Sequence, residues 1–416
     1  MKKIYYGNII AAAAFVVWLT VWGTYATFGI FLKPITSEFG WERGDMALAY
    51  SLSALVQALS ALVMGRLTDK LGPRFIVTVF GSCLAAAYLL LARITSIGQF
   101  QVTYALLGAV GLSTATVPIM TTIARWFARQ RGTVTGIVQS GMGIGGLIFA
   151  PLTGWLIVKF DWRTAYFSLG MITLPLIVLA GLLLKRDPGG NVNSAGQEDG
   201  LRRKAENREN VPEPGLSLQQ AMRIKQFWMI AGMFFSFGFC RSTFLAHTAA
   251  YVQDLGYALS DGANVMAVLT FSSILGRMGL GLLADKTASR TVYLLSFGIM
   301  ITALFWGRFT DQLWGIFLFA VLFGISWGGQ AVLRFTFTAE MFGLMNLGVI
   351  TGILGLTEAG AAAFGSFFAG VVFDLAGTYK IMFTLGAILS LGGLVLAYLT
   401  KPPGGEAYEP ANNHTT

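Results

Sequence analysis

The chain has 416 residues, of which 55% are hydrophobic and only 12% are charged, and its mean hydropathy is +0.65. This composition excludes a water-soluble protein and indicates a membrane protein. The formal net charge of +9 would suggest a nucleic-acid partner in a soluble protein. In a membrane protein we expect it to set the orientation of the loops instead.

Twelve long apolar stretches follow one another along the chain, each close to the roughly 20 residues that an α-helix needs to cross the hydrocarbon core. A polar run at about 186–225 divides them six and six. We therefore expect an all-α membrane protein with 12 transmembrane helices in two six-helix pseudo-repeats. The expected spans are 8–33, 44–65, 74–93, 98–124, 132–158, 164–184, 226–252, 262–284, 290–308, 311–338, 345–373 and 380–399.

The expected domain organisation follows from this pattern. It comprises an N-terminal six-helix bundle (1–185), a linker (186–225), a C-terminal six-helix bundle (226–400) and a tail (401–416). The linker is rich in proline, glycine, asparagine, serine and charged residues, which is typical of a flexible connection. Leu216–Arg223 is expected to form a short surface helix. The N-terminal apolar run is interpreted as a retained first helix rather than a cleaved signal peptide.

Lysine and arginine are distributed unequally between the two sets of loops. Most lie at the N-terminus, after spans two, four and eight, in the linker and in the tail, whereas the opposite loops hold few. Positively charged loops stay in the cytoplasm. We therefore expect a cell (inner) membrane protein with both termini and the linker in the cytoplasm.

The segment Gly65–Arg74 reads GRLTDKLGPR, and Gly281–Arg290 repeats its pattern 216 residues later. Two further blocks, Ala124–Ile137 and Ala339–Ile353, match at nearly the same offset. The repeats indicate duplicated six-helix halves, an arrangement found in transporters that rock around a midplane site.

Gly65–Arg74 resembles the loop between helices two and three of the major facilitator superfamily, and Gly281–Arg290 occupies the equivalent loop between helices eight and nine. The resemblance covers essentially the whole chain and implies the fold of that superfamily. Charged residues of these loops are expected to form ion pairs between the halves that favour the outward-facing state; alternatively they only set topology. The expected gating residues are Asp69, Arg66, Lys70, Arg74, Asp285 and Lys286.

Within that superfamily, Gly29–Ile35 (GIFLKPI) followed by Glu38–Trp41 (EFGW) resembles the branch of monocarboxylate transporters and oxalate/formate exchangers. The pair Gly276-Arg277 in span eight fits the same branch. In these families an arginine of helix eight binds the carboxylate of the substrate, so the resemblance implies this role for Arg277.

Arg277 is a charged residue deep in an apolar span, where a charge is costly. It lies eight residues from Asp285, at the cytoplasmic end of its span, and is therefore about 12 Å deep at 1.5 Å per residue. A charge near the bilayer centre costs roughly 2.5–3.5 kcal/mol on insertion scales. A guanidinium binds a carboxylate through paired N–H donors. We expect Arg277 to bind the substrate carboxylate; the alternative is a structural ion pair.

Glu358 lies about 18 Å inside span eleven. The oxalate/formate exchangers resemble this segment but typically carry a lysine at this position. Two cations suit a dianion, whereas Arg277 with Glu358 favours a monoanion. An acid in an apolar bundle is a candidate for the coupled proton. The alternative is a buried pairing of Glu358 with Arg277 or Arg241.

His247, about 10 Å from the outer end of span seven, titrates near physiological pH. We expect it to donate to the carboxylate or to relay a proton, the alternative being a packing role. Arg241 on the same helix points roughly 120° away. Both side chains cannot face one cavity, so Arg241 is expected to have a structural partner. Arg334, near the end of span ten, is expected to extend to the membrane surface.

Helical spacing adds weaker candidates for the cavity wall. Trp327, Gln330 and Arg334 share one helix face, and Trp18, Trp22 and Tyr25 share another, although such aromatic stripes also serve packing alone. Beyond Arg277 and His247, the expected substrate-binding residues are Tyr25, Thr116, Gln139, Trp327 and Gln330.

These observations predict a secondary transporter that works by alternating access. Its expected cargo is a small monocarboxylate such as lactate or pyruvate, accompanied by a proton on Glu358 or His247. Exchange of organic anions of the oxalate/formate type and export of a drug or siderophore are the alternatives. The sequence holds no evident metal-ligand cluster, nucleophile triad or phosphate loop. We therefore expect no enzyme activity, cofactor, metal or nucleic-acid partner, and a monomer in the lipid bilayer.

Overall fold

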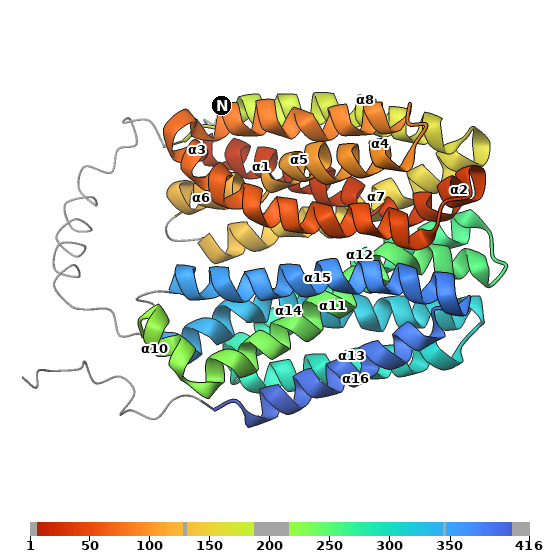
Figure 1. The fold of residues 1–416 in the computed structure, drawn as a ribbon. Helices are drawn as coiled ribbons and strands as arrows, with labels where there is room; N and C mark the ends of the chain where they lie inside the picture. Colours follow the sequence, from red (N-terminus) through yellow and green to blue (C-terminus); the bar gives the residue numbers. More distant parts are fainter. Residues whose placement is uncertain (1–5, 128–130, 187–215, 344–346, 402–416) are drawn as a thin grey trace, which may run out of the picture.

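The computed structural model describes residues 6–127, 131–186, 216–343 and 347–401. All the regular elements in these ranges are helices, and most of them run lengthwise through the molecule (Figure 1). The all-α fold expected from the apolar stretches is confirmed.

The first half contains one π-helical segment, η1, among α-helices. Its elements are α1 (Tyr6–Tyr25), α2 (Phe28–Phe39), α3 (Arg43–Leu91), α4 (Ile97–Val102), η1 (Thr103–Gly108), α5 (Ala109–Ser113), α6 (Val117–Trp126), α7 (Arg131–Lys159) and α8 (Trp162–Leu183).

The second half begins with the short helix expected before span seven, where Ser217 and Gln220 form a capping box. Its elements are α10 (Leu218–Arg223), α11 (Lys225–Asp254), α12 (Leu259–Lys286), α13 (Ser289–Phe309), α14 (Leu313–Phe342), α15 (Leu347–Ala376) and α16 (Lys380–Leu399).

Among the described residues, 11 helical stretches are long and apolar enough to cross a membrane. The expected span 44–65 is not one of them, although it forms the first part of α3. Gly72, with φ of 82°, kinks α3 between the expected second and third spans. The part before the kink carries Ser51, Ser53 and Gln57. It is nevertheless an apolar helix like those 11 stretches, and together with them it accounts for the twelve expected crossings.

Two expected spans are interrupted. The first span is divided at Ala26 and Thr27, where the Thr27 hydroxyl bonds the Thr24 carbonyl, and it continues as α2 to Phe39. The fourth span is divided between α5 and α6, because Pro118 lies in the first turn of α6 and cannot donate a backbone hydrogen bond to the preceding turn.

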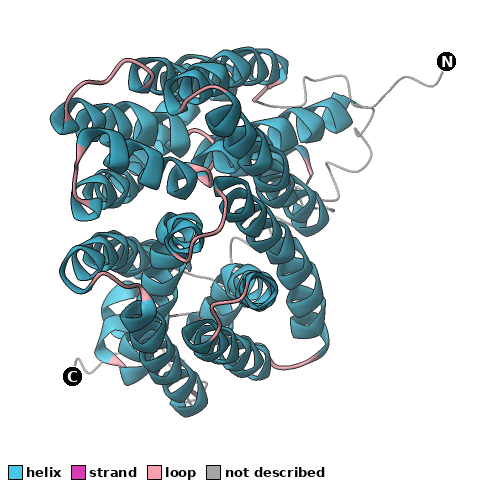
Figure 2. Cartoon of the chain, turned by 90° about the vertical axis from the view of Figure 1, so that its right-hand side faces the viewer, coloured by secondary structure: helices cyan, strands magenta, loops and turns pink. Residues whose placement is uncertain are grey.

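The two halves meet along α7 and α12, along α3 and α15, and where α2 touches α11. Figure 2 shows the helices gathered into two groups. Glycines of α7 permit the close approach: a Cβ on Gly146 would lie 2.2 Å from the Thr270 hydroxyl of α12, and one on Gly143 would lie 2.8 Å from the Thr270 carbonyl oxygen. Small residues commonly allow such helix contacts where lipid offers no hydrophobic drive for packing.

Candidate functional site

A cavity of about 270 Å³ lies between the two halves. Helices of both halves supply its wall, as expected for a midplane site in a two-fold repeat. From the first half, the lining side chains used below are Trp18, Trp22, Tyr25, Gln57, Thr116 and Gln139. From the second half they are Phe237, Arg241, Arg277, Trp327, Arg334 and Glu358.

Arg277 reaches across the cavity from α12 to α7. Its guanidinium donates to the Gln139 carbonyl oxygen at 3.2 Å and to the Met142 sulfur at 3.3 Å. The Trp327 ring centroid lies 5.7 Å from its central carbon. Within the described parts of the chain, no carboxylate lies within ion-pair distance of Arg277. The expected alternative, a structural ion pair, is therefore not found there, and the guanidinium charge faces the cavity.

Glu358 forms the ion-pair centre of the cavity. It is 7% exposed, and its carboxylate binds the guanidinium of Arg334 and lies 3.7 Å from that of Arg241. The expectation that Arg334 extends to the membrane surface is wrong, because Arg334 turns inward to this carboxylate. The expected structural partner of Arg241 is Glu358, yet Arg241 also lines the cavity. Arg277 takes no part in this cluster.

The charges of the cavity do not balance. Three arginines and one glutamate line it, which leaves a formal excess of two positive charges. Buried charges of one sign are costly unless a counter-ion is present. The cavity is therefore suited to an anion.

His247 and Gln330 were expected in the cavity, and both lie outside its lining. His247 is 2% exposed and lies 2.9 Å from both the Tyr379 hydroxyl and the Ser366 carbonyl oxygen. Gln330 is buried, and its amide donates to the Ser326 hydroxyl at 3.1 Å. The same amide lies 3.8 Å from the Met300 sulfur, so Gln330 faces α13 instead of the cavity.

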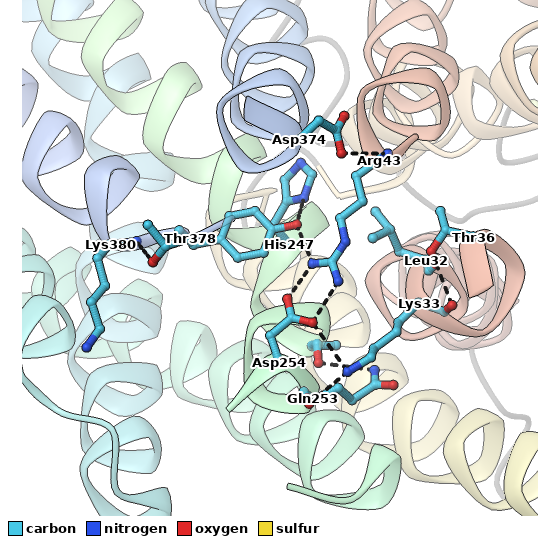
Figure 3. A network of polar contacts seen from close by, with 12 residues as sticks. Leu32, Lys33, Thr36, Arg43, His247, Gln253, Asp254, Asp374, Thr378 and Lys380 are labelled. Atoms are coloured by element: carbon cyan, nitrogen blue, oxygen red, sulfur yellow. Dashed lines mark hydrogen bonds and ion pairs between the residues drawn. The ribbon is translucent and has the colours of Figure 1, made fainter. Parts of the chain in front are cut away.

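The end of the molecule opposite the linker is held closed by a polar network that we call the latch: Lys33, Arg43, Asp254, Asp374 and Tyr379. Figure 3 labels the first four of these residues. Arg43 at the start of α3 forms a bidentate ion pair with Asp254 at the end of α11, with one bond of 2.7 Å. Lys33 of α2 lies 3.3 Å from the same carboxylate. The latch thus joins the first half to the second.

Asp374 of α15 closes the latch from another side. Its two carboxylate oxygens accept from the backbone N–H groups of Arg43 at 3.1 Å and Gly44 at 2.7 Å. These N–H groups have no partner within α3, because they lie at its N-terminus and Glu42 makes no side-chain cap there. A carboxylate also suits the positive end of a helix dipole. The second half therefore caps a helix of the first.

Tyr379 connects His247 to the latch. Its hydroxyl accepts from the Arg43 guanidinium at 3.0 Å, and burial raises the pKa of Tyr379, so the hydroxyl keeps its proton. The Ser366 carbonyl can only accept, so Nε2 of His247 carries a hydrogen. In a neutral ring, Nδ1 then accepts from Tyr379. His247 therefore orients a latch residue rather than facing the cavity.

The expected gating residues at the linker end stay a prediction. Arg66, Lys70, Arg74 and Lys286 are exposed. The side chains of Asp69 and Asp285 lie outside the described part of the structure, so the ion pairs expected of them are not tested.

The sequence analysis did not single out Arg43, Asp254 or Asp374. The signal was present, since each lies within two residues of the end of an expected span on the side opposite the linker. Opposite charges at such ends can pair, but the sequence does not show which helix ends meet.

Comparison with known proteins places this geometry in a family. Residues 10–305 match the Major Facilitator Superfamily. The chain belongs to this superfamily, whose members are transporters. The resemblance of its loops to that superfamily is therefore confirmed, and with it the twelve-helix fold.

The relatives support the expected branch. The chain is 24% identical to monocarboxylate transporter 13 of Bos taurus, over 95% of this chain and 89% of the relative. It is 25% identical to the oxalate:formate antiporter of Oxalobacter formigenes, over 92% of this chain and 88% of the relative. A solved bacterial homologue of the human lysosomal transporter Spinster, in an inward-facing and occupied conformation, shares the fold with a TM-score of 0.75 at 14% identity, covering 95% of this chain and 96% of that one.

Proposed function

We propose that this transporter moves a small monocarboxylate, of the size of lactate or pyruvate, together with a proton. The observation that carries the proposal is Arg277, a guanidinium in the cavity with no carboxylate partner in the described ranges. A cargo carboxylate would supply that partner through paired hydrogen bonds. Tyr25, Thr116, Gln139 and Trp327 line the same cavity and would contact the rest of the cargo.

The latch supports transport by alternating access. With the linker in the cytoplasm, as the loop charges predict, the latch lies on the outer side. Its ion pairs close that side, which fits an inward-facing or an occluded state. Cargo binding would favour the state in which both halves contact the cargo, and release of the latch would open the outer side.

Glu358 is proposed to couple the proton. In this structure its carboxylate competes with any cargo anion for Arg241 and Arg334. Protonation removes that competitor and frees both guanidinium groups, so proton and anion each favour the binding of the other. His247 is withdrawn as a cavity residue and is proposed to act only through the latch.

Exchange of a dianion is the second candidate. The formal excess of two positive charges suits a dicarboxylate, and one relative is an oxalate:formate antiporter. This charge count was not visible from Arg277 and Glu358 alone, which had favoured a monoanion.

Uptake into proteoliposomes separates the two candidates. Radiolabelled lactate, pyruvate and oxalate would be offered with and without an inward proton gradient, and with and without unlabelled anion inside. Symport predicts accumulation of lactate or pyruvate that follows the proton gradient without internal anion. A requirement for internal anion, with oxalate preferred, would instead establish exchange.

A further inference from the structure

Aromatic rings face Arg277 from both halves. Trp18, Trp22 and Tyr25 line the cavity from α1, and Phe237 and Trp327 line it from α11 and α14. A site built only for an acid of a few atoms needs the cation and a short apolar wall, not opposed aromatic surfaces.

The α1 rings form a continuous group. The centroids of Trp18 and Trp22 are 5.8 Å apart, as are those of Trp22 and Tyr25, and the second pair meets edge to face. Trp18 and Tyr25 are almost fully buried, whereas Trp22 is half-buried. Trp22 therefore offers the largest free ring surface on the first-half side.

On the second-half side, Trp327 lies beside the cation, since its ring centroid is 5.7 Å from the central carbon of the Arg277 guanidinium. A carboxylate bound to Arg277 is therefore held beside an aromatic surface. A ring joined to that carboxylate by a short carbon chain would lie beside Trp327, and Trp22 lines the same cavity from the first half.

The size of the cavity points to one ring. Its volume of about 270 Å³ equals that of about nine liquid waters at roughly 30 Å³ each. Lactate, with about six non-hydrogen atoms, would leave much of the aromatic wall uncovered. Pockets for drug-sized ligands typically measure ~300–1,000 Å³, so this cavity lies at the small end of that range, where one ring fits better than several.

We propose that, among monocarboxylates, the site prefers those bearing one aromatic ring, with the carboxylate on Arg277 and the ring between Trp22 and Trp327. This inference rests on the proposed carboxylate transport and names the class of acid that the site prefers. Aromatic pairs contribute beyond the area they bury, and contacts on two sides predict a preference of roughly tenfold.

Lactate and 3-phenyllactate form a matched pair that differs by one phenyl ring. Uptake of both radiolabelled acids into proteoliposomes would be measured with wild type, Trp22→Leu, Trp327→Leu and Trp314→Leu. Trp314 lies on α14 like Trp327 but is 60% exposed outside the cavity, so its variant is the matched control. Thermal stabilisation of each purified variant by the two acids reports binding independently of transport.

The half-saturation concentration of wild type should be about tenfold lower for 3-phenyllactate than for lactate. Trp22→Leu and Trp327→Leu should each reduce this ratio severalfold, and Trp314→Leu should keep it. Lactate uptake without a preference, or a preference that survives both cavity variants, would overturn this inference and leave the proposed function standing. Absence of uptake and of stabilisation with both acids would overturn the two together.

Discussion

At the scale of single residues, the three arginines that line the cavity differ in what neutralises them. Arg241 and Arg334 share the carboxylate of Glu358, whereas the polar and ring contacts of Arg277 among the described residues are a carbonyl oxygen, a sulfur and an aromatic ring. A charge in a membrane protein is normally paired or faces water. Arg277 is thus the arginine whose charge an incoming anion would neutralise most effectively.

The substitution Glu358→Gln tests the coupling scheme. The amide side chain would carry no titratable proton, so accumulation of lactate driven by a pH gradient should be lost. Exchange of internal for external lactate should persist, because Arg277 is untouched. Uptake into proteoliposomes with and without a pH gradient measures both activities.

Glu340→Gln provides the matched control, because Glu340 is an exposed acid of α14 that pairs with Ser289 away from the cavity. Accumulation by Glu358→Gln at the level of this control would remove Glu358 from the coupling scheme.

The sequence predicted the depth of these residues better than their direction. Counting residues at 1.5 Å per residue placed Arg277 and Glu358 deep in their spans, and the cavity includes both. The direction of Gln330, His247 and Arg334 was not predicted, because it depends on which neighbouring helix offers a partner. Met300 of α13, Ser366 of α15 and Glu358 of α15 supply those partners, respectively.

At the scale of helices, the latch is built from helix ends. The start of α3 meets the ends of α11 and α15, and the middle of α2 adds Lys33. Glu38 in the same segment binds Trp162 and Arg163 of α8 at 2.6 Å, which holds α2 against its own half. The segment Gly29–Trp41 that resembles the monocarboxylate branch thus positions the latch.

Replacing Asp254 with asparagine should open the latch. The change removes the charge that holds Arg43 and Lys33, and hydrogen bonds to charged groups contribute about 1.5–3 kcal/mol. The population open at the latch end should therefore rise by about tenfold or more. Spin labels on Glu42→Cys and Leu375→Cys, which are exposed on opposite halves, would report the opening as longer distances in a chain whose Cys83 and Cys240 are replaced by serine.

Asp261→Asn is the control for this experiment, since Asp261 only caps α12 within the second half. A distance distribution for Asp254→Asn that matches this control would show that the latch does not hold the halves together.

The repeat and the hydropathy pattern were sufficient to predict the helices, but not their breaks or their partners. The division of span one at Thr27 and the kink at Gly72 arise from local backbone bonds and from a positive φ angle. The contacts between the halves depend on glycines of α7 whose packing partners lie more than 100 residues away in the sequence. Periodicity within one helix does not contain this information.

At the scale of the whole molecule, the loop charges and the latch together indicate how the protein is oriented in the membrane. The linker end carries most of the positive loop charges, and the latch closes the other end. The linker should therefore face the cytoplasm and the latch the outside.

Labelling of single cysteines in intact cells tests this orientation. In the background without Cys83 and Cys240, Ser194→Cys in the linker should react with an impermeant thiol reagent only after the cells are broken. Thr95→Cys, exposed in the loop before α4 on the latch side, should react in intact cells. The reverse pattern would invert the topology and place the closed side of this conformation in the cytoplasm.

The central claim concerns an anion bound between the two halves by one guanidinium. Uptake of radiolabelled carboxylates by Arg277→Ala, Arg277→Lys and the exposed-arginine control Arg93→Ala tests it most directly, with folding checked by size-exclusion chromatography. Arg277→Ala should raise the half-saturation concentration by about tenfold to hundredfold, Arg277→Lys by less because the charge remains without the paired donors, and Arg93→Ala not at all. Uptake by folded Arg277→Ala equal to that of wild type would contradict the account.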